Sequence, residues 1–166
     1  MIDDTTLIFR IAPLLLVAGT TLMATIVVVG NLTDPRSNLQ YVERILSMDT
    51  TFRSPRLMWR AIRSPKLQRL AFGVIVLLEA AVVVTGWIGT AILASNLRAG
   101  TDDWHDAKFW AALALVLALV VWFVAFEIGG NEWFASWQSD TWRAAEQTPR
   151  INLVTLAALI LLAIST

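Results

Sequence analysis

Long uncharged apolar runs separated by polar segments are the feature that most constrains the fold of this chain. Ile11–Gly30 carries no charged residue, and Leu70–Leu97 carries only Glu79. Phe109–Phe126 and Ile151–Thr166 are also free of charge. A helix needs about 20 apolar residues to cross the hydrocarbon core of a bilayer, because each residue adds only about 1.5 Å. The sequence therefore predicts an all-α, polytopic membrane protein with four transmembrane helices.

The residue types present exclude several classes of functional site. The chain has no cysteine and a single histidine, His105. Thiolate zinc sites, iron–sulfur clusters and disulfides are therefore excluded within one copy, as is a three-histidine zinc site. Gly-rich phosphate loops and nucleophile elbows are also missing from the sequence. We expect no metal site, no cofactor held by this chain alone and no enzymatic activity, while a bound lipid or quinone stays open.

The apolar runs and the polar segments between them form a single domain, residues 1–166. A long loop over 31–64 should contain short helices. Within it, Ser37–Met48 has apolar residues at helical period and predicts an amphipathic helix, lying either on the membrane surface or against the span ends. We expect the four spans at about 6–30, 65–95, 107–129 and 149–166.

Three tripeptides of Ser or Thr, Pro and a basic residue begin at Ser54, Ser64 and Thr148. Ser and Thr favour the N-cap of a helix and Pro favours its first turn. The tripeptides therefore predict a short helix over Pro55–Arg63 and the starts of the second and fourth spans. Near the other end of the chain, Arg10 lies one turn inside the first span, where its side chain can extend to the lipid headgroups.

Basic residues gather in two of the three connections between the spans. The segment 31–69 holds eight of the thirteen Lys and Arg residues, and Arg143 and Arg150 lie between the third and fourth spans. Cytoplasmic loops of membrane proteins are enriched in Lys and Arg. This bias places the first and third connections in the cytoplasm and both termini on the opposite side.

Glu79 is the one charged residue near the middle of a predicted span. An ionised carboxylate at that depth costs several kcal/mol unless it is paired or protonated, so such residues are candidates for function. Glu79 could carry a proton, bind an ion or pair with a basic group of another subunit. Alternatively it fixes the helix register, protonated or hydrogen-bonded to a Thr hydroxyl or to an indole N–H such as that of Trp122.

The segment after the third span is rich in aromatic residues. Glu127 closes that span, close to Arg63, Lys66 and Arg69, and an ion pair at the interface is the simplest expectation. Trp133, Phe134, Trp137 and Thr141 would share one face of a helix. The segment predicts either an interfacial anchor or a surface for a partner or lipid, with these candidate residues: Trp133, Phe134, Trp137, Gln138 and Trp142.

Several motifs together resemble a known bacterial family, that of predicted small integral membrane proteins with a domain of unknown function. They are NLTDPRSN (31–38), SMDTTF (47–52), the MWRAI run (58–62), the lone Glu79 and the GG-EWF--WQS--W pattern of 129–142. The resemblance covers nearly the whole chain and implies four spans in a bacterial inner membrane, with no assigned activity. In such a membrane the bias of basic residues would make both termini periplasmic. Asn131, Ser136 and Arg143 depart from the usual pattern, which puts in doubt any ligand that the aromatic motif holds.

The functional hypothesis rests mainly on the kinds of site that the sequence lacks. The chain offers no redox ligands and no nucleotide site, yet it carries patterned segments at the membrane surface. We therefore expect a non-catalytic accessory or assembly subunit of a larger inner-membrane complex, respiratory or photosynthetic, whose partners are lipids and other subunits rather than nucleic acid. The alternative is an oligomeric proton-coupled transporter or channel that uses Glu79.

Overall fold

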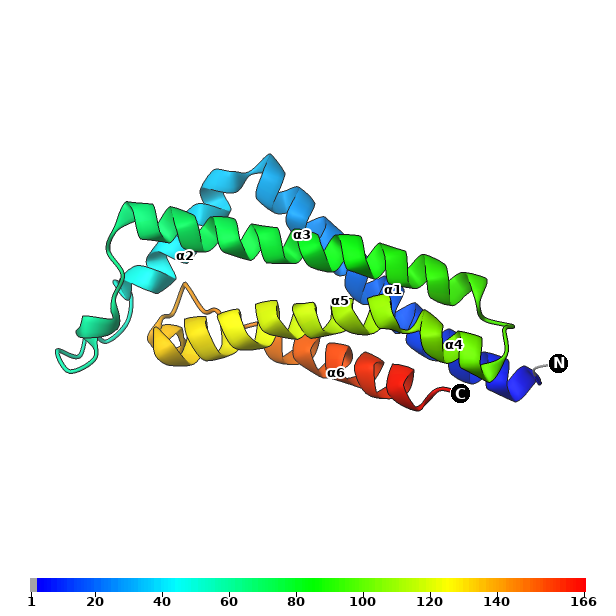
Figure 1. Cartoon of the computed structure of the whole chain (residues 1–166). Coiled ribbons are helices and arrows are strands. Elements are labelled where there is room, and N and C mark those ends of the chain that lie inside the picture. Colours follow the sequence, from blue (N-terminus) through cyan, green and yellow to red (C-terminus); the bar gives the residue numbers. More distant parts are fainter. Residues whose placement is uncertain (1–2) are drawn as a thin grey trace.

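The computed structural model describes residues 3–166, and every regular element in that range is helical. The long helices lie side by side in an elongated bundle, with the N- and C-termini at one end and α2 at the other (Figure 1). The α-helices are α1 (Asp4–Thr33), α2 (Pro35–Ser47), α3 (Pro65–Ser95), α4 (Thr101–Ala107), α5 (Phe109–Leu119) and α6 (Thr148–Ile164). The remaining elements are the 3₁₀-helices η1 (Met58–Arg60) and η3 (Ser136–Gln138) and the π-helix η2 (Val120–Trp133).

Three helical segments within residues 3–166 are long and apolar enough to cross a membrane: α1, α3 and the continuous stretch Thr101–Trp133. The prediction of a helical integral membrane protein agrees with this. The fourth helix, α6, has 17 residues, which corresponds to only about 26 Å at 1.5 Å per residue. It packs against α1, α5 and η2, but whether it forms a fourth complete span stays a prediction, as does the side of the membrane that each end faces.

Local sequence signals explain where the helices begin. The side chain of Asp3 accepts a hydrogen bond of 2.7 Å from the amide of Thr6 and caps α1. Proline occupies the first turn of both α3 and α6, as the Ser64 and Thr148 tripeptides predict. The Ser54 tripeptide behaves differently. The helix predicted over Pro55–Arg63 is wrong, because the chain there forms turns and only the three-residue η1.

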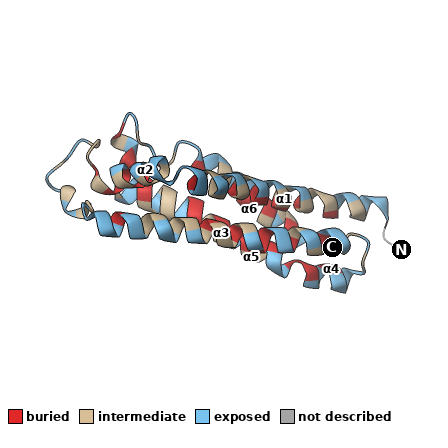
Figure 2. Ribbon diagram, turned by 90° about the horizontal axis from the view of Figure 1, so that it is seen from above, coloured by how far each residue is buried: buried red, intermediate tan, exposed pale blue. Residues whose placement is uncertain are grey.

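Close approach of α3 to its neighbours depends on two glycines. A Cβ atom at Gly86 would collide with the side chain of Thr21 on α1, and a Cβ at Gly89 would collide with the backbone of Ala111 on α5. Small residues allow such contacts between membrane helices, which gain van der Waals energy when their backbones approach closely. The buried residues accordingly lie along the inner faces of the helices, while the outer faces are exposed (Figure 2).

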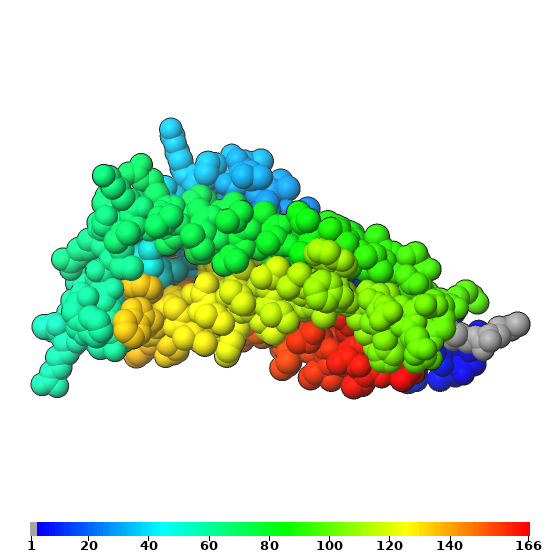
Figure 3. All heavy atoms as spheres, in the orientation of Figure 1, coloured from blue at the N-terminus to red at the C-terminus, as the bar shows by residue number. Residues whose placement is uncertain are grey.

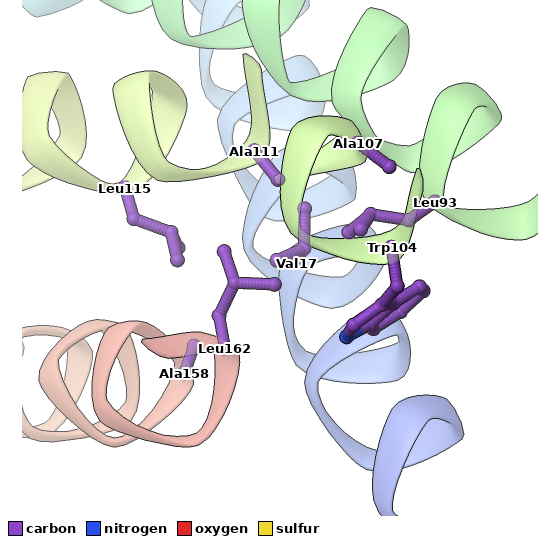
Figure 4. Packing of buried hydrophobic residues seen from close by; sticks show 8 residues of the cluster. All are labelled: Val17, Leu93, Trp104, Ala107, Ala111, Leu115, Ala158 and Leu162. Carbon is purple, nitrogen blue, oxygen red and sulfur yellow. The ribbon is translucent and has the colours of Figure 1, made fainter. Parts of the chain in front are cut away.

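The main apolar core lies near the end that carries the termini. Trp104 from α4 is fully buried and packs beside side chains of α1, α3, α5 and α6 (Figure 4). The labelled cluster consists of Val17, Leu93, Trp104, Ala107, Ala111, Leu115, Ala158 and Leu162. A second cluster follows toward the middle of the bundle and includes Trp122 of η2. Together the two clusters hold all the long helices in contact.

Arg10 is buried in the bundle, so the expectation that it extends to the lipid headgroups is wrong. Its side chain is only 1% exposed. The guanidinium donates hydrogen bonds to the carbonyl oxygens of Ala99 (2.7 Å), Thr166 (2.8 Å) and Leu97 (3.2 Å), and it lies 4.8 Å from the ring centroid of Trp104. The α3–α4 connection provides two of these acceptors and the residue Thr166 beyond α6 provides the third, while α4 contributes the ring of Trp104; sequence periodicity reveals none of these contacts.

Candidate functional site

Glu79 occupies the middle of α3 and is almost fully buried, with 1% of its surface exposed. Its Oε2 atom accepts a hydrogen bond of 2.6 Å from the side-chain amide of Asn31 on α1. Trp122, one of the alternative donors considered for this carboxyl group, does not make the contact, although its ring lies in the same region. Asn31 was missed because it follows the predicted end of the first span, whereas α1 continues to Thr33 and runs obliquely behind α3 (Figure 1).

Glu79 lines a cavity of about 350 Å³ between α1, α2, α3, η2 and the start of α6. Apolar side chains form much of its wall: Val27, Phe72, Ile75, Trp122, Phe126 and Ile151. Polar groups from α2, from the segment before α6 and from the start of α6 also line the cavity: Asn38, Tyr41, Arg143, Glu146, Gln147 and Thr148. Pockets of this size with apolar walls and a few polar groups are typical of small-molecule sites.

Tyr41 connects α2 to the segment before α6 at this cavity. Its hydroxyl donates a hydrogen bond of 2.9 Å to the carbonyl oxygen of Arg143, and its ring lies 6.0 Å from that of Trp142. Burial raises the pKa of Tyr41 to about 12, and the negative charge of Glu146 adds to the effect. The phenol therefore keeps its proton, and with it the hydrogen bond, well above neutral pH.

The ionisation of Tyr41 is directly measurable because the chain has one tyrosine. We expect its tyrosinate absorbance to rise with a midpoint near pH 12 in the folded protein, against about 10 in the denatured chain. A raised pKa means that the protonated phenol stabilises the fold below pH 10, and this contribution is lost as the pH rises toward 12.

The variant Glu146→Gln should lower this midpoint, because it removes the nearby negative charge. Asp140→Asn is the matched control, since Asp140 lies in the same segment but does not contribute to the shift. A midpoint near 10 in the folded wild-type protein would contradict the half-buried position of Tyr41 beside Glu146.

Glu127 does not form the expected ion pair with Arg63, Lys66 or Arg69. Its Oε2 atom instead accepts a hydrogen bond from the hydroxyl of Thr148 at the start of α6. Within residues 3–166 the ion pairs are Arg44–Asp49 and Arg143–Asp140. The interaction of Glu127 therefore connects η2 to α6 at the edge of the cavity, because Thr148 also contributes to its lining.

The segment after η2 is irregular, so the single helical face expected for Trp133, Phe134, Trp137 and Thr141 is wrong. Ala135 has a left-handed backbone (φ 52°), which ends the helix, and only η3 follows. Phe134 consequently lines a smaller apolar cavity beside Tyr41. Trp133 and Trp137, by contrast, are exposed.

Trp133 and Trp137 pair with residues of the 49–64 connection. Trp133 meets Trp59 edge-to-face with ring centroids 5.7 Å apart, and Trp137 meets Phe52 in the same way at 6.2 Å. The backbone amide of Phe52 donates a hydrogen bond of 3.1 Å to Oε1 of Gln138. We call these two pairs, together with Arg60, the aromatic surface: Phe52, Trp59, Arg60, Trp133 and Trp137.

The aromatic surface lies at the end of the molecule away from the termini. Phe52 is 74% exposed and Trp59 is 70% exposed. The guanidinium carbon of Arg60 lies 4.7 Å from the ring centroid of Trp133 and 5.6 Å from that of Trp59. The connection that carries Phe52 and Trp59, teal in the space-filling view, forms the tip opposite the start of α1, which is blue (Figure 3).

Residues 3–166 contain no group of three or more His, Cys, Asp or Glu side chains that could hold a metal ion. A family model described as predicted small integral membrane protein (DUF2165) matches residues 9–165 of the chain. No match was found among curated proteins or among solved structures. The family match thus extends over both the Glu79 cavity and the aromatic surface.

Proposed function

The chain belongs to the family of predicted small integral membrane proteins, and from this premise we propose that it is a non-catalytic accessory or assembly subunit of a larger inner-membrane complex. The aromatic surface carries this proposal. Trp and Arg are enriched among the residues that dominate the energy of protein interfaces. Here two exposed Trp residues and a half-buried Arg lie together in fixed mutual geometry.

The occupant that fits this surface is another membrane-protein subunit rather than lipid headgroups. An interfacial anchor needs only amphipathic rings and no fixed arrangement of them. In this chain, two edge-to-face pairs and an arginine stacked on two indoles order the rings before any partner binds. Such preorganisation lowers the entropic cost of association.

The short α6 helix supports the same proposal. At about 26 Å it falls short of a hydrocarbon core of about 30 Å. A short apolar helix is accommodated by local thinning of the bilayer or by association with a partner. In the proposed arrangement the end with the aromatic surface faces the cytoplasm, which agrees with the ten basic residues of its two connections.

We expect the double variant Trp133→Ala and Trp137→Ala to reduce co-purification of partner subunits at least about tenfold, because two anchor residues of the interface are lost. Membrane insertion should stay at the wild-type level, since the apolar helices alone determine it. The measurement is blue-native electrophoresis of gently solubilised membranes with a tagged chain.

The double variant Phe109→Ala and Trp110→Ala is the matched control. These two residues also form an exposed edge-to-face pair, with centroids 5.5 Å apart, but they lie at the other end of the bundle. This control should migrate with the partners as the wild type does. Wild-type protein that migrates only as a small species, or the first double variant co-purifying at full yield, would contradict the proposal.

The cavity around Glu79 favours a second candidate, an oligomeric proton-coupled transporter. A buried carboxyl group at a cavity wall can bind and release a proton, as relay groups in pumps and transporters do. Dissipation of a pH gradient by the protein in liposomes should then require Glu79, and Glu79→Gln should reduce it to the level of empty liposomes. Equal flux through Glu79→Gln and the wild type would exclude this candidate.

A further inference from the structure

The charges around the Glu79 cavity are unbalanced toward the acidic side. Glu79 and Glu146 both contribute to the lining, and among the described residues that line it Arg143 is the one basic residue. The guanidinium of Arg143 is directed to other groups: its Nε donates a hydrogen bond of 2.8 Å to the carbonyl oxygen of Ser139, and an Nη atom lies 3.6 Å from Asp140. The cavity therefore presents carboxyl groups with little internal compensation.

The carboxyl group of Glu79 has a free position for a ligand. Asn31 occupies Oε2, while Oε1 receives no hydrogen bond from any residue in the described range 3–166. A carboxylate can accept hydrogen bonds at both oxygen atoms. Glu79 is only 1% exposed. Its ionised carboxylate is therefore costly without a compensating positive charge nearby.

The walls of the cavity suit the apolar part of a ligand. Aromatic side chains of Phe72, Trp122 and Phe126 come from α3 and η2, and Tyr41 adds a fourth ring from α2. The faces of aromatic rings attract cations, most strongly when the cation is removed from water. A ligand with carbonyl groups alone fits less well, because the Asn31 amide that faces this site already donates to Glu79.

We propose that the cavity binds an amphipathic organic cation, with its ammonium group against Oε1 of Glu79 and its apolar body between Phe72, Trp122 and Phe126. The ammonium supplies both the missing charge and the missing donor. The polar residues of α2 and of the segment before α6, including Glu146, accommodate water or the polar end of the ligand. The inference concerns binding alone and holds whether or not the ligand is transported.

The test compares two probes of similar shape, 2-phenylethylammonium and the uncharged 2-phenylethanol. The full chain is placed in nanodiscs of zwitterionic phosphatidylcholine, and binding is followed by calorimetry and by tryptophan fluorescence. We expect the wild type to bind the ammonium probe at least about tenfold more tightly than the alcohol, as a buried charge pair with a hydrogen bond provides. This comparison requires no variant, so it stands even if a substitution impairs folding.

Variants then assign the effect to Glu79. Glu79→Gln should remove the preference for the ammonium probe and leave binding of the alcohol unchanged. Glu43→Gln is the matched control, because Glu43 lies on α2 but does not line the cavity. Three results would overturn the proposal: equal binding of both probes by the wild type, which indicates an apolar pocket for lipid chains; no binding of the ammonium probe; or an unchanged preference in Glu79→Gln.

Discussion

Replacing Gly89 by leucine is expected to lower the free energy of unfolding by at least about 3 kcal/mol, at or above the usual range for overpacking. Even a single Cβ at this position would collide with backbone atoms of Trp110 and Ala111 on α5. A flexible side chain could turn aside, but backbone atoms cannot yield unless the two helices move apart. Separation would open the core around Leu93 and Ala111. The measurement is unfolding in mixed micelles with SDS, followed by circular dichroism.

Gly73→Leu is the matched control for Gly89→Leu. Gly73 lies on the same helix, but a Cβ atom there meets nothing within 4 Å. A leucine at this exposed position should be neutral or stabilising, since leucine has a higher helix propensity than glycine by about 1 kcal/mol and is favourable in lipid. If both variants unfold at the same SDS fraction, the close approach of α3 and α5 is not needed for stability.

Arg10→Met should cost about 3–5 kcal/mol of stability, because hydrogen bonds to charged groups contribute about 1.5–3 kcal/mol each. Methionine keeps much of the apolar stem but leaves the carbonyl oxygens of Leu97, Ala99 and Thr166 without their donor. The contact with the ring of Trp104 is also lost. The same unfolding assay applies, and protection of the 96–104 amides from hydrogen exchange should fall most.

Arg98→Met provides the control for Arg10→Met. Arg98 lies in the same connection between α3 and α4, but it is exposed and donates no hydrogen bond within the described residues 3–166. It should change stability by less than about 0.5 kcal/mol, as is usual for surface substitutions. An Arg10→Met protein as stable as Arg98→Met would show that the buried guanidinium does not hold the terminal end of the bundle together.

The predictable part of the fold is the part that local composition determines. The helix from Pro65 to Ser95 has the predicted bounds, because a Pro-led start and an uninterrupted apolar run both depend on nearby residues alone. The amphipathic pattern of Ser37–Met48 likewise lies over α2. By contrast, the helices expected over Pro55–Arg63 and after Trp133 are wrong, because long-range contacts hold those segments in irregular conformations. The contact between Phe52 and Gln138 is one of them.

The sequence alone identifies only part of the candidate site. A lone carboxylate in an apolar run identifies Glu79 by itself, whereas its partner Asn31 depends on the length and inclination of α1. The same holds for the aromatic motif. Composition identifies Trp133 and Trp137, but their pairing with Trp59 and Phe52 joins segments about seventy residues or more apart in the chain. The periodicity of apolar residues reflects local structure and cannot predict such long-range pairs.

The contact between Arg10 and Thr166 joins residues 156 positions apart, and this sets an order on how the protein matures. Arg10 is synthesised while two of its acceptors, Leu97 and Ala99, are still untranslated. Its last acceptor arrives only when α6 is in place. The guanidinium on α1 therefore lacks every one of these acceptors until the α3–α4 connection is made, and it lacks the carbonyl oxygen of Thr166 until α6 has packed against α1.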